Sequence, residues 1–210
     1  MNFSTLFAKI ISYLFHPLLM PMLGLFLVFN LGSMGLWMSN RPAIYLLTFI
    51  ATFLLPLTVA LLLLRMKYIS SLEMQTKEER KLPYLATAVF YYAEFYFLMN
   101  SDVPALVKAL MLGATLLVVS ALLINLFWKV SAHMVGIGGI CGMMIAVSYR
   151  LQMDLNYMLI PLFLIAGLVG YARLKLSSHS PAQVYAGFLV GVAMEVFLFG
   201  YEIFHVSGRG

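Results

Sequence analysis

A histidine, two cations and a helix start occur together near the C-terminal end of a chain that otherwise avoids charge. Arg173 and Lys175 close one apolar segment, and Ser180 followed by Pro181 is typical of the N-cap and first position of the next helix. His179 therefore precedes a helix N-terminus, where unpaired backbone N–H groups and the helix dipole favour an anion. This combination predicts the binding of an anion the size of phosphate.

A second polar group precedes another apolar segment and contains Lys129, Ser131 and His133. Ser131 is placed to cap the helix, which would leave backbone amides near His133 for phosphate oxygens. Histidine titrates near neutral pH, so His133 could act in proton transfer. The alternative is an interfacial histidine that is hydrogen-bonded to a backbone carbonyl.

The longest polar stretch of the chain is Lys67–Lys81, for which we expect a short surface helix. Within it, Lys77 and Arg80 are further candidates for binding phosphate. The alternative is a solvated charged turn whose Glu–Arg pairs contribute little to stability.

The group near the C-terminus resembles the third signature of the type 2 phosphatidic acid phosphatase superfamily, which includes the vanadium haloperoxidases. In that signature an arginine is followed after five residues by a histidine, and after three more by an aspartate that opens a helix. Arg173, His179 and Gln183 keep this spacing. The sequence departs from the family at Gln183, which replaces the aspartate, and at Ala172, where the family usually has serine.

The second group resembles the family's Pro-Ser-Gly-His signature, because Ser131 and His133 are kept while Val130 and Ala132 replace the proline and glycine. The resemblance covers about residues 129–191. It extends only weakly to the charged stretch, because the family's lysine and Arg-Pro pair are spaced differently there. It implies a compact α-helical bundle with a phosphate pocket at helix ends.

The resemblance also implies roles for individual residues. His179 would be the nucleophile, His133 would protonate the leaving oxygen, and Gln183 would orient the nucleophile in place of the aspartate. A glutamine can accept the same hydrogen bond but stabilises an imidazolium less than a carboxylate does. The residues that would bind phosphate are Arg173, Arg80, Lys129, Lys77 and Ser131.

The composition indicates a membrane protein. Of the 210 residues, 63% are hydrophobic and 10% charged, whereas soluble domains carry roughly 25% charged residues. The net charge of +5 is small, and no basic stripe indicates nucleic-acid binding. The single cysteine, Cys141, cannot form an internal disulfide and has no partners at metal-ligand spacing. We expect neither a metal nor a cofactor.

Windows of roughly twenty apolar residues predict membrane-spanning helices. We expect an all-α, polytopic membrane helix bundle with six or seven transmembrane helices, in one integral membrane domain over residues 1–210. The expected spans lie near residues 10–31, 43–64, 83–100, 104–126, 132–149, 156–172 and 182–204. With seven spans, the charged stretch and both histidine groups would face the same side of the membrane. Which side remains open, because some of the cations that would set orientation could instead bind phosphate.

Other ionisable residues fall inside predicted spans. Glu94 and Glu195 are functional candidates by default, and the alternative is a carboxyl held neutral or bonded to a tyrosine. Glu195 is fourteen residues beyond the start of its helix, or about 21 Å along it, too far to act on His179. His16 and His205 are expected to bond backbone or interfacial water, since no spacing supports a haem or metal site.

The composition therefore predicts a multi-pass membrane protein, for which we expect the inner membrane. The resemblance implies a phosphoric ester hydrolase that removes phosphate from a lipid phosphomonoester or diphosphate through a phosphohistidine. The alternative is a catalytically impaired relative that binds or transports a phospholipid or small anion. Gln183, Ala172 and the altered first signature favour the alternative. A structural subunit of a larger membrane complex is a third possibility. The lipid and the oligomeric state are left open.

Overall fold

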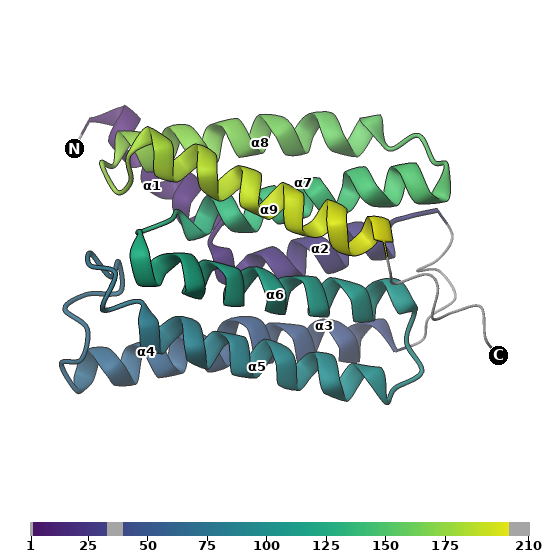
Figure 1. Ribbon diagram of the computed structural model, residues 1–210, viewed down its shortest axis with the longest axis horizontal. Coiled ribbons are helices and arrows are strands. Elements are labelled where there is room, and N and C mark those ends of the chain that lie inside the picture. The colour runs from purple at the N-terminus through teal and green to yellow at the C-terminus, as the bar shows by residue number, and fades with distance from the viewer. Residues whose placement is uncertain (1, 33–39, 202–210) are drawn as a thin grey trace. The chain divides into compact units, whose positions relative to one another are not determined.

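A computed structural model describes residues 2–32 and 40–201. Over these ranges all regular secondary structure is helical, which confirms the predicted all-α class (Figure 1). The elements are α1 (Phe3–Leu14), η1 (Pro17–Leu19), α2 (Met20–Phe29), α3 (Arg41–Phe49), η2 (Ile50–Leu54), α4 (Leu55–Arg65), α5 (Lys81–Met99), α6 (Ala105–Phe127), α7 (Ala132–Leu151), α8 (Asn156–Lys175) and α9 (Pro181–Tyr201).

Five helices of the described chain are long and apolar enough to cross a membrane. They are Arg41–Arg65, Ala105–Phe127, Ala132–Leu151, Asn156–Lys175 and Pro181–Gly200. The predicted first span is instead broken: Phe3–Leu14 and Pro17–Phe29 meet at a 40° bend, and together they would make a sixth span. The break falls at His16, whose successor Pro17 has no N–H to donate to a continuous helix.

The predicted span over residues 83–100 corresponds to α5, which is 19 residues long but is not among the helices that pass this test. Its tyrosines and Glu94 lower its hydropathy. Helix length and apolar composition therefore give five or six candidate membrane spans in the described chain, not seven.

The chain divides into two compact units. Unit 1 contains the residues up to Met20 and those from Lys129 onward, and unit 2 contains Pro21–Trp128. The two polar groups around His133 and His179 both belong to unit 1.

In unit 1, α7 packs most extensively against α9 and also against α8 and η1, while α1 packs on α8. Helices α7 and α9 run parallel, since Gly138 faces Phe188 and Gly142 faces Val192 in the same order along both. Figure 1 shows α8 returning beside them in the opposite direction.

Glycines allow α7 and α9 to approach at backbone distance. A Cβ added to Gly142 would lie 2.5 Å from the carbonyl oxygen of Val192, and one on Gly187 would lie 2.8 Å from that of Ser131. Added Cβ atoms on Gly138 and Gly191 would also collide with backbone of the facing helix. This packing fixes the start of α9 beside the start of α7.

In unit 2, α3, η2 and α4 form one continuous helical run over Arg41–Arg65, interrupted by the π-helical turn η2. The antiparallel pair α5 and α6 packs with this run. Residues 66–80 form turns, so the surface helix expected within Lys67–Lys81 is wrong. Lys67 and Met74 adopt positive φ angles of 62° and 49°, which a right-handed helix does not allow.

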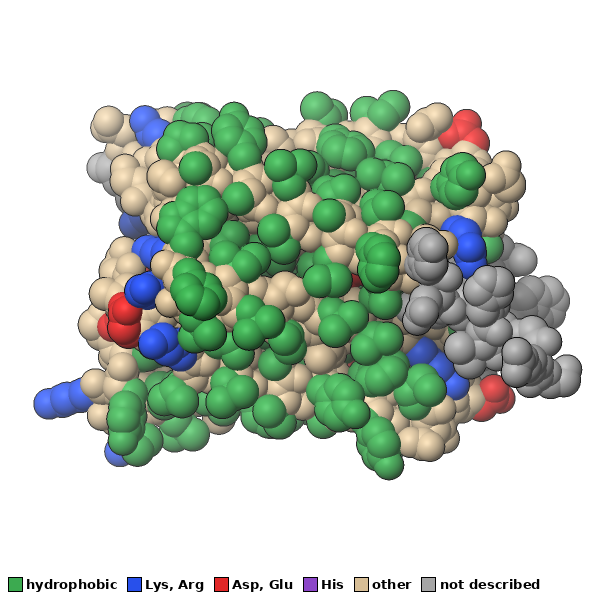
Figure 2. Space-filling model, viewed as in Figure 1, with side chains coloured by type: hydrophobic (Ala, Val, Ile, Leu, Met, Phe, Trp, Pro, Cys, Tyr) green, Lys and Arg blue, Asp and Glu red, His purple; other side chains and the backbone are tan. Residues whose placement is uncertain are grey.

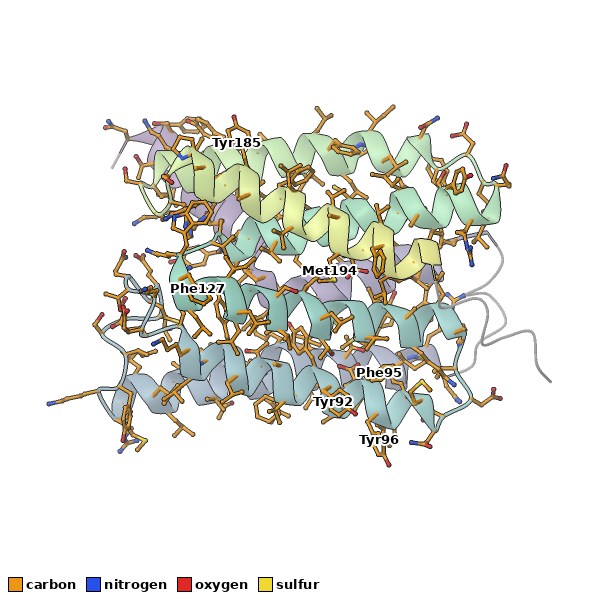
Figure 3. The ribbon with its side chains drawn as sticks, in the orientation of Figure 1. Tyr92, Phe95, Tyr96, Phe127, Tyr185 and Met194 are labelled. Carbon is orange, nitrogen blue, oxygen red and sulfur yellow. The ribbon has the colours of Figure 1, made fainter. Side chains whose placement is uncertain are left out.

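Many side chains exposed along the helices of each unit are hydrophobic, as expected for helices in contact with lipid. In Figure 2 hydrophobic side chains cover the flanks of the helices, whereas charged side chains gather near the helix ends. In Figure 3 Tyr185 lies near the start of α9 and Phe127 at the end of α6; these side chains are 66% and 84% exposed. Aromatic side chains at helix ends are typical of membrane–water interfaces.

Candidate functional site

Four chain segments of unit 1 meet at one end of its helices. Because α7 and α9 run parallel and α8 returns between them, the starts of α7 and α9 lie near the end of α8 (Figure 1). The Ser131 amide donates to the Gln183 carbonyl at 3.4 Å, which joins the two helix starts. The break between α1 and η1 completes this end, since η1 packs on α7.

His179 and Gln183 are held together by the cap of α9. The Ser180 amide donates to Gln183 Oε1 at 3.1 Å, and the Gln183 amide donates to Ser180 Oγ at 3.4 Å, which is a reciprocal capping box. His179 Nδ1 lies 3.0 Å from the same Oε1. An amide oxygen only accepts, so Nδ1 carries the proton and Nε2 carries the lone pair of the neutral ring.

His133 and Arg173 are linked through Ser12 of α1. His133 Nε2 lies 3.1 Å from the Ser12 carbonyl oxygen, and Arg173 Nη1 donates to the Ser12 hydroxyl at 3.2 Å. Because the carbonyl only accepts, His133 carries its proton on Nε2 and its lone pair on Nδ1. A backbone carbonyl partner is the alternative considered for His133 from sequence, and it is present.

His16 lies against His133. Their rings meet edge to face with centroids 5.5 Å apart, and His16 Nδ1 accepts the Leu18 amide at 3.3 Å as the cap of η1. His133 also lies within electrostatic range of Arg173, His16 and His179. Three imidazoles and one guanidinium are therefore neighbours at this end of unit 1. The backbone bond predicted for His16 is confirmed.

Ser131 occupies the predicted N-cap position of α7, but its side chain makes no capping hydrogen bond. Its hydroxyl is buried and has no hydrogen-bond partner among the described residues. The first intrahelical bond of α7 runs from Val135 N–H to the Ser131 carbonyl, so the amides of the first turn stay available to an anion. A buried hydroxyl without a partner costs free energy unless a bound group satisfies it.

Comparison with protein-family models, with curated proteins and with solved structures finds no match. The site is therefore interpreted from its own geometry. Over residues 2–32 and 40–201, no group of three or more histidine, cysteine, aspartate or glutamate side chains could hold a metal ion. The chemistry available to the site is that of imidazoles, a guanidinium and helix N-termini.

The structure brings together His133, Arg173, His179 and Gln183, with Ser131 at the adjoining helix start. Lys129 belongs to the same unit and precedes that start by two residues.

Lys77 and Arg80 lie in unit 2. Lys77 Nζ donates to the Leu126 carbonyl at 3.2 Å, and the Asn125 side chain donates to the Lys77 carbonyl at 2.7 Å. Arg80 Nε donates to the Met74 carbonyl at 3.0 Å, and Arg80 is buried. These bonds order the turns between α4 and α5. The predicted role of both residues in phosphate binding stays a prediction.

Sequence reasoning missed Ser12 as a site residue and gave His16 no place beside His133. The only local signal was the His-Pro pair, which breaks the first span and brings this helix end to the site. Of the two glutamates considered, Glu94 belongs to unit 2 and is bonded to Thr48 of another helix, and Glu195 is buried along α9 in unit 1. His205 lies outside the described residues.

Proposed function

We propose that this protein is a membrane-embedded phosphatase that removes phosphate from a lipid phosphomonoester or diphosphate. The observation that carries the proposal is the pair His179–Gln183: Nδ1 lies 3.0 Å from an amide oxygen, so the proton is on Nδ1 and Nε2 carries the lone pair that a nucleophile requires, just before a helix start. The multi-pass arrangement supports a lipid substrate, and we assign the protein to the inner membrane.

In the first step, His179 Nε2 would attack phosphorus, a P–N bond would form, and the bond from phosphorus to the leaving oxygen would break. His133, when protonated on Nδ1 as well as Nε2, would give its Nδ1 proton to that oxygen. Arg173 and the first-turn amides of α7 would stabilise the charge on the other phosphate oxygens. The Ser131 hydroxyl would donate to one of them.

In the second step, water would attack phosphorus, and the P–N bond would break to release phosphate. His133, now neutral, would accept the proton of that water at Nδ1. Through both steps Gln183 would hold His179 by its Nδ1 proton. The phosphorylated ring is cationic, and a neutral amide compensates this charge less than a carboxylate would. We therefore expect slow turnover.

The test is phosphate release from a panel of lipid phosphates in detergent. Wild type is expected to release vanadate-sensitive phosphate, and His179→Ala is expected to release none. Arg173→Gln should lose at least ~100-fold in kcat/KM. Arg150→Gln is the matched control, because Arg150 lies at the other end of α7, where it donates to the Gly200 carbonyl at 3.2 Å. Unchanged release in His179→Ala would refute the proposal.

A second candidate function is binding or transport of a phospholipid or small anion without hydrolysis. It is favoured by the neutral Gln183 and by the bond that already engages His133 Nε2 with the Ser12 carbonyl. Saturable vanadate or phosphate binding that is lost in Arg173→Gln, without phosphate release by wild type, would support this candidate over the phosphatase. Gln183→Asp separates them further, since a large gain in rate would indicate a site that has lost an earlier activity.

A further inference from the structure

Unit 2 contains a buried polar network that the proposed function does not use. Thr48 and Thr52 lie on the Arg41–Arg65 helix, and Tyr91 and Glu94 lie on α5. All four side chains are at most 2% exposed. Burial of four polar side chains inside a membrane helix bundle is costly unless their hydrogen bonds are satisfied.

The network is linked by three hydrogen bonds. The Thr48 hydroxyl donates to Glu94 Oε1 at 2.5 Å, and the Thr52 hydroxyl donates to the Thr48 carbonyl at 2.7 Å. The Tyr91 hydroxyl donates to the Thr52 carbonyl at 3.3 Å. The two helices are therefore joined by side-chain and backbone oxygens.

The network lies on the π-helical turn η2, where the Leu55 amide reaches back five residues to the Ile50 carbonyl. A π-helical turn breaks the regular ladder of backbone bonds and frequently marks a functional site. Here one carbonyl of the turn, that of Thr52, accepts from Tyr91 of another helix. In membrane transporters, unwound segments of interrupted helices coordinate Na⁺ or H⁺ through backbone carbonyls.

Glu94 is incompletely satisfied within this network. Its Oε2 atom is buried and has no hydrogen-bond partner among the described residues. An ionised Glu94 would carry a buried charge without a counter-ion, and in a protonated Glu94 the Oε2 atom would be either an O–H without an acceptor or a carbonyl oxygen without a donor. Both protonation states therefore leave Oε2 short of a partner.

We propose that Glu94, Thr48 and the adjoining π-helical turn bind a monovalent alkali cation, for which Na⁺ is the probe. Oxygen ligands suit a hard cation. The Thr48 hydroxyl can keep its proton on Glu94 Oε1 while its lone pairs face the ion. One carboxylate and neutral oxygens balance a single positive charge, whereas a divalent ion would leave a net buried charge.

The charged groups on the neighbouring elements lie toward helix ends. Lys108 of α6 donates to the Met99 carbonyl at 3.3 Å, and the Arg41 guanidinium lies over the Phe29 ring with 5.6 Å to its centroid. Lys81 and Arg65 are at the start of α5 and the end of α4. Tyr91 is the other titratable group beside Glu94. A proton therefore competes with the cation chiefly at Glu94.

The site lies about two helix turns from one helix end. Thr48 is seven residues from Arg41, where α3 begins, or about 10 Å along the helix. An ion would need to pass only the first two turns of α3 and the last turns of α5.

The test uses the purified full-length protein in detergent with NaCl, KCl, LiCl or choline chloride at equal ionic strength. We expect saturable binding of radiolabelled sodium. We also expect the apparent Tm to rise by about 3–6 °C at ten times the half-saturating NaCl concentration, relative to choline chloride. Half-saturation should require more Na⁺ as the pH falls, because a proton competes for the carboxylate.

Glu94→Gln keeps the shape of the side chain and removes its charge, and Thr48→Val removes the hydroxyl. Both variants are expected to lose at least 10-fold in sodium affinity. Glu195→Gln is the matched control, since Glu195 is 3% exposed and has a carboxyl oxygen without a partner, but no hydroxyl of residues 2–32 or 40–201 is bonded to it. This control should bind sodium as wild type does. Absence of saturable sodium binding to wild type, or equal binding in Glu94→Gln, would overturn the proposal.

Discussion

At the scale of single residues, Gln183 serves two functions. Its side chain caps α9 by accepting the Ser180 amide, and it also accepts from His179 Nδ1. Capping alone accounts for a glutamine three residues after Ser180. Only the contact with His179 would affect catalysis. A substitution that preserves the helix cap can therefore separate the catalytic role of Gln183 from its capping role.

Gln183→Glu is the substitution that separates them. Glutamate has the same length and completes a capping box equally well, so the stability of α9 should not change. Its charge would strengthen the bond to a cationic His179 ring by about 1.4 kcal/mol, which corresponds to about a 10-fold gain in rate. Phosphate release and Tm are the two measurements. An unchanged Tm with unchanged release would assign Gln183 to the helix cap alone.

Ser12→Ala tests whether α1 positions the guanidinium of the site. The change removes the hydroxyl that accepts from Arg173 Nη1. Loss of one hydrogen bond to a charged group is worth about 1.5–3 kcal/mol, so we expect vanadate affinity to fall by at least 10-fold. Ser4→Ala is the control on the same helix. Equal affinity in both variants would show that Ser12 does not position Arg173.

The residues of the site differ in how far sequence reasoning could reach them. His179 and Gln183 lie four positions apart, and one helix turn brings them together whatever the rest of the chain does. Ser12 meets His133 and Arg173 across separations of 121 and 161 residues. His133 contacts the backbone carbonyl of Ser12, a group that every residue type has, so the identity of residue 12 does not reveal this contact. Such a contact has no local signature and follows only from the packing of α1 on α8.

At the scale of elements, the close approach of α7 and α9 depends on residues without side chains. An alanine at Gly142 would place its Cβ 2.5 Å from the Val192 carbonyl oxygen and 2.8 Å from its Cα. Backbone atoms cannot rotate away, so the two helices would have to separate. We expect Gly142→Ala to cost about 1–3 kcal/mol, measured by thermal unfolding in detergent.

Gly167→Ala is the matched control, because a Cβ at Gly167 of α8 meets nothing within 4 Å. Alanine is the better helix former by about 1 kcal/mol, so this variant should be as stable as wild type or more stable. Equal Tm values for the two variants would contradict the packing described for α7 and α9.

The turns of residues 66–80 depend on one carboxylate. Hydrogen bonds from Ser70, from its hydroxyl and its amide, lower the pKa of Glu79 below its ordinary value of 4.5. A lowered pKa means that the ionised form is bound more strongly in the folded turn. The contribution is therefore present above pH 4.5 and is lost as the pH falls through the lowered value.

Amide hydrogen exchange at Ser70 and Thr76, whose amides donate to Glu79 at 2.6 and 3.4 Å, measures this effect. We expect protection to fall at acid pH in wild type and to be low at every pH in Glu79→Gln. Glu78→Gln, which changes an exposed neighbour, should keep the wild-type pH dependence. Protection independent of pH in wild type would contradict this assignment.

Helix interruptions were harder to predict than helices. Apolar length located most spans, because the bilayer sets a minimum number of apolar residues. The π-helical turn η2 has no comparable signal: Ile50–Leu54 is as apolar as its surroundings. Its backbone bond from Leu55 to Ile50 and its partners on α5, where Thr48 and Thr52 meet Glu94 and Tyr91, are features of the folded structure alone.

At the scale of the whole molecule, the number of membrane-spanning helices depends on whether α5 crosses the membrane. Its 19 residues can span a bilayer, but its tyrosines and Glu94 keep its mean hydropathy below that of the other candidate spans. Glu94 is directed to Thr48, inside the unit, and Tyr91 is buried with it. Tyr92 and Tyr96 are exposed, toward the outer face of α5 in Figure 3. The polar groups that lower the hydropathy are thus either satisfied inside unit 2 or amphipathic, so we expect α5 to cross the membrane.

Single-cysteine variants test this crossing. Glu78 and Asp102 are exposed and flank α5 on either side. Cysteines at these positions, introduced in a Cys141→Ala background, should react with a membrane-impermeant maleimide from opposite sides of sealed vesicles. Wild type is the control for background, because Cys141 is fully buried and should not react without denaturation. Labelling of both positions from the same side would make α5 a re-entrant segment. The helix that carries Glu94 would then enter the bilayer without crossing it.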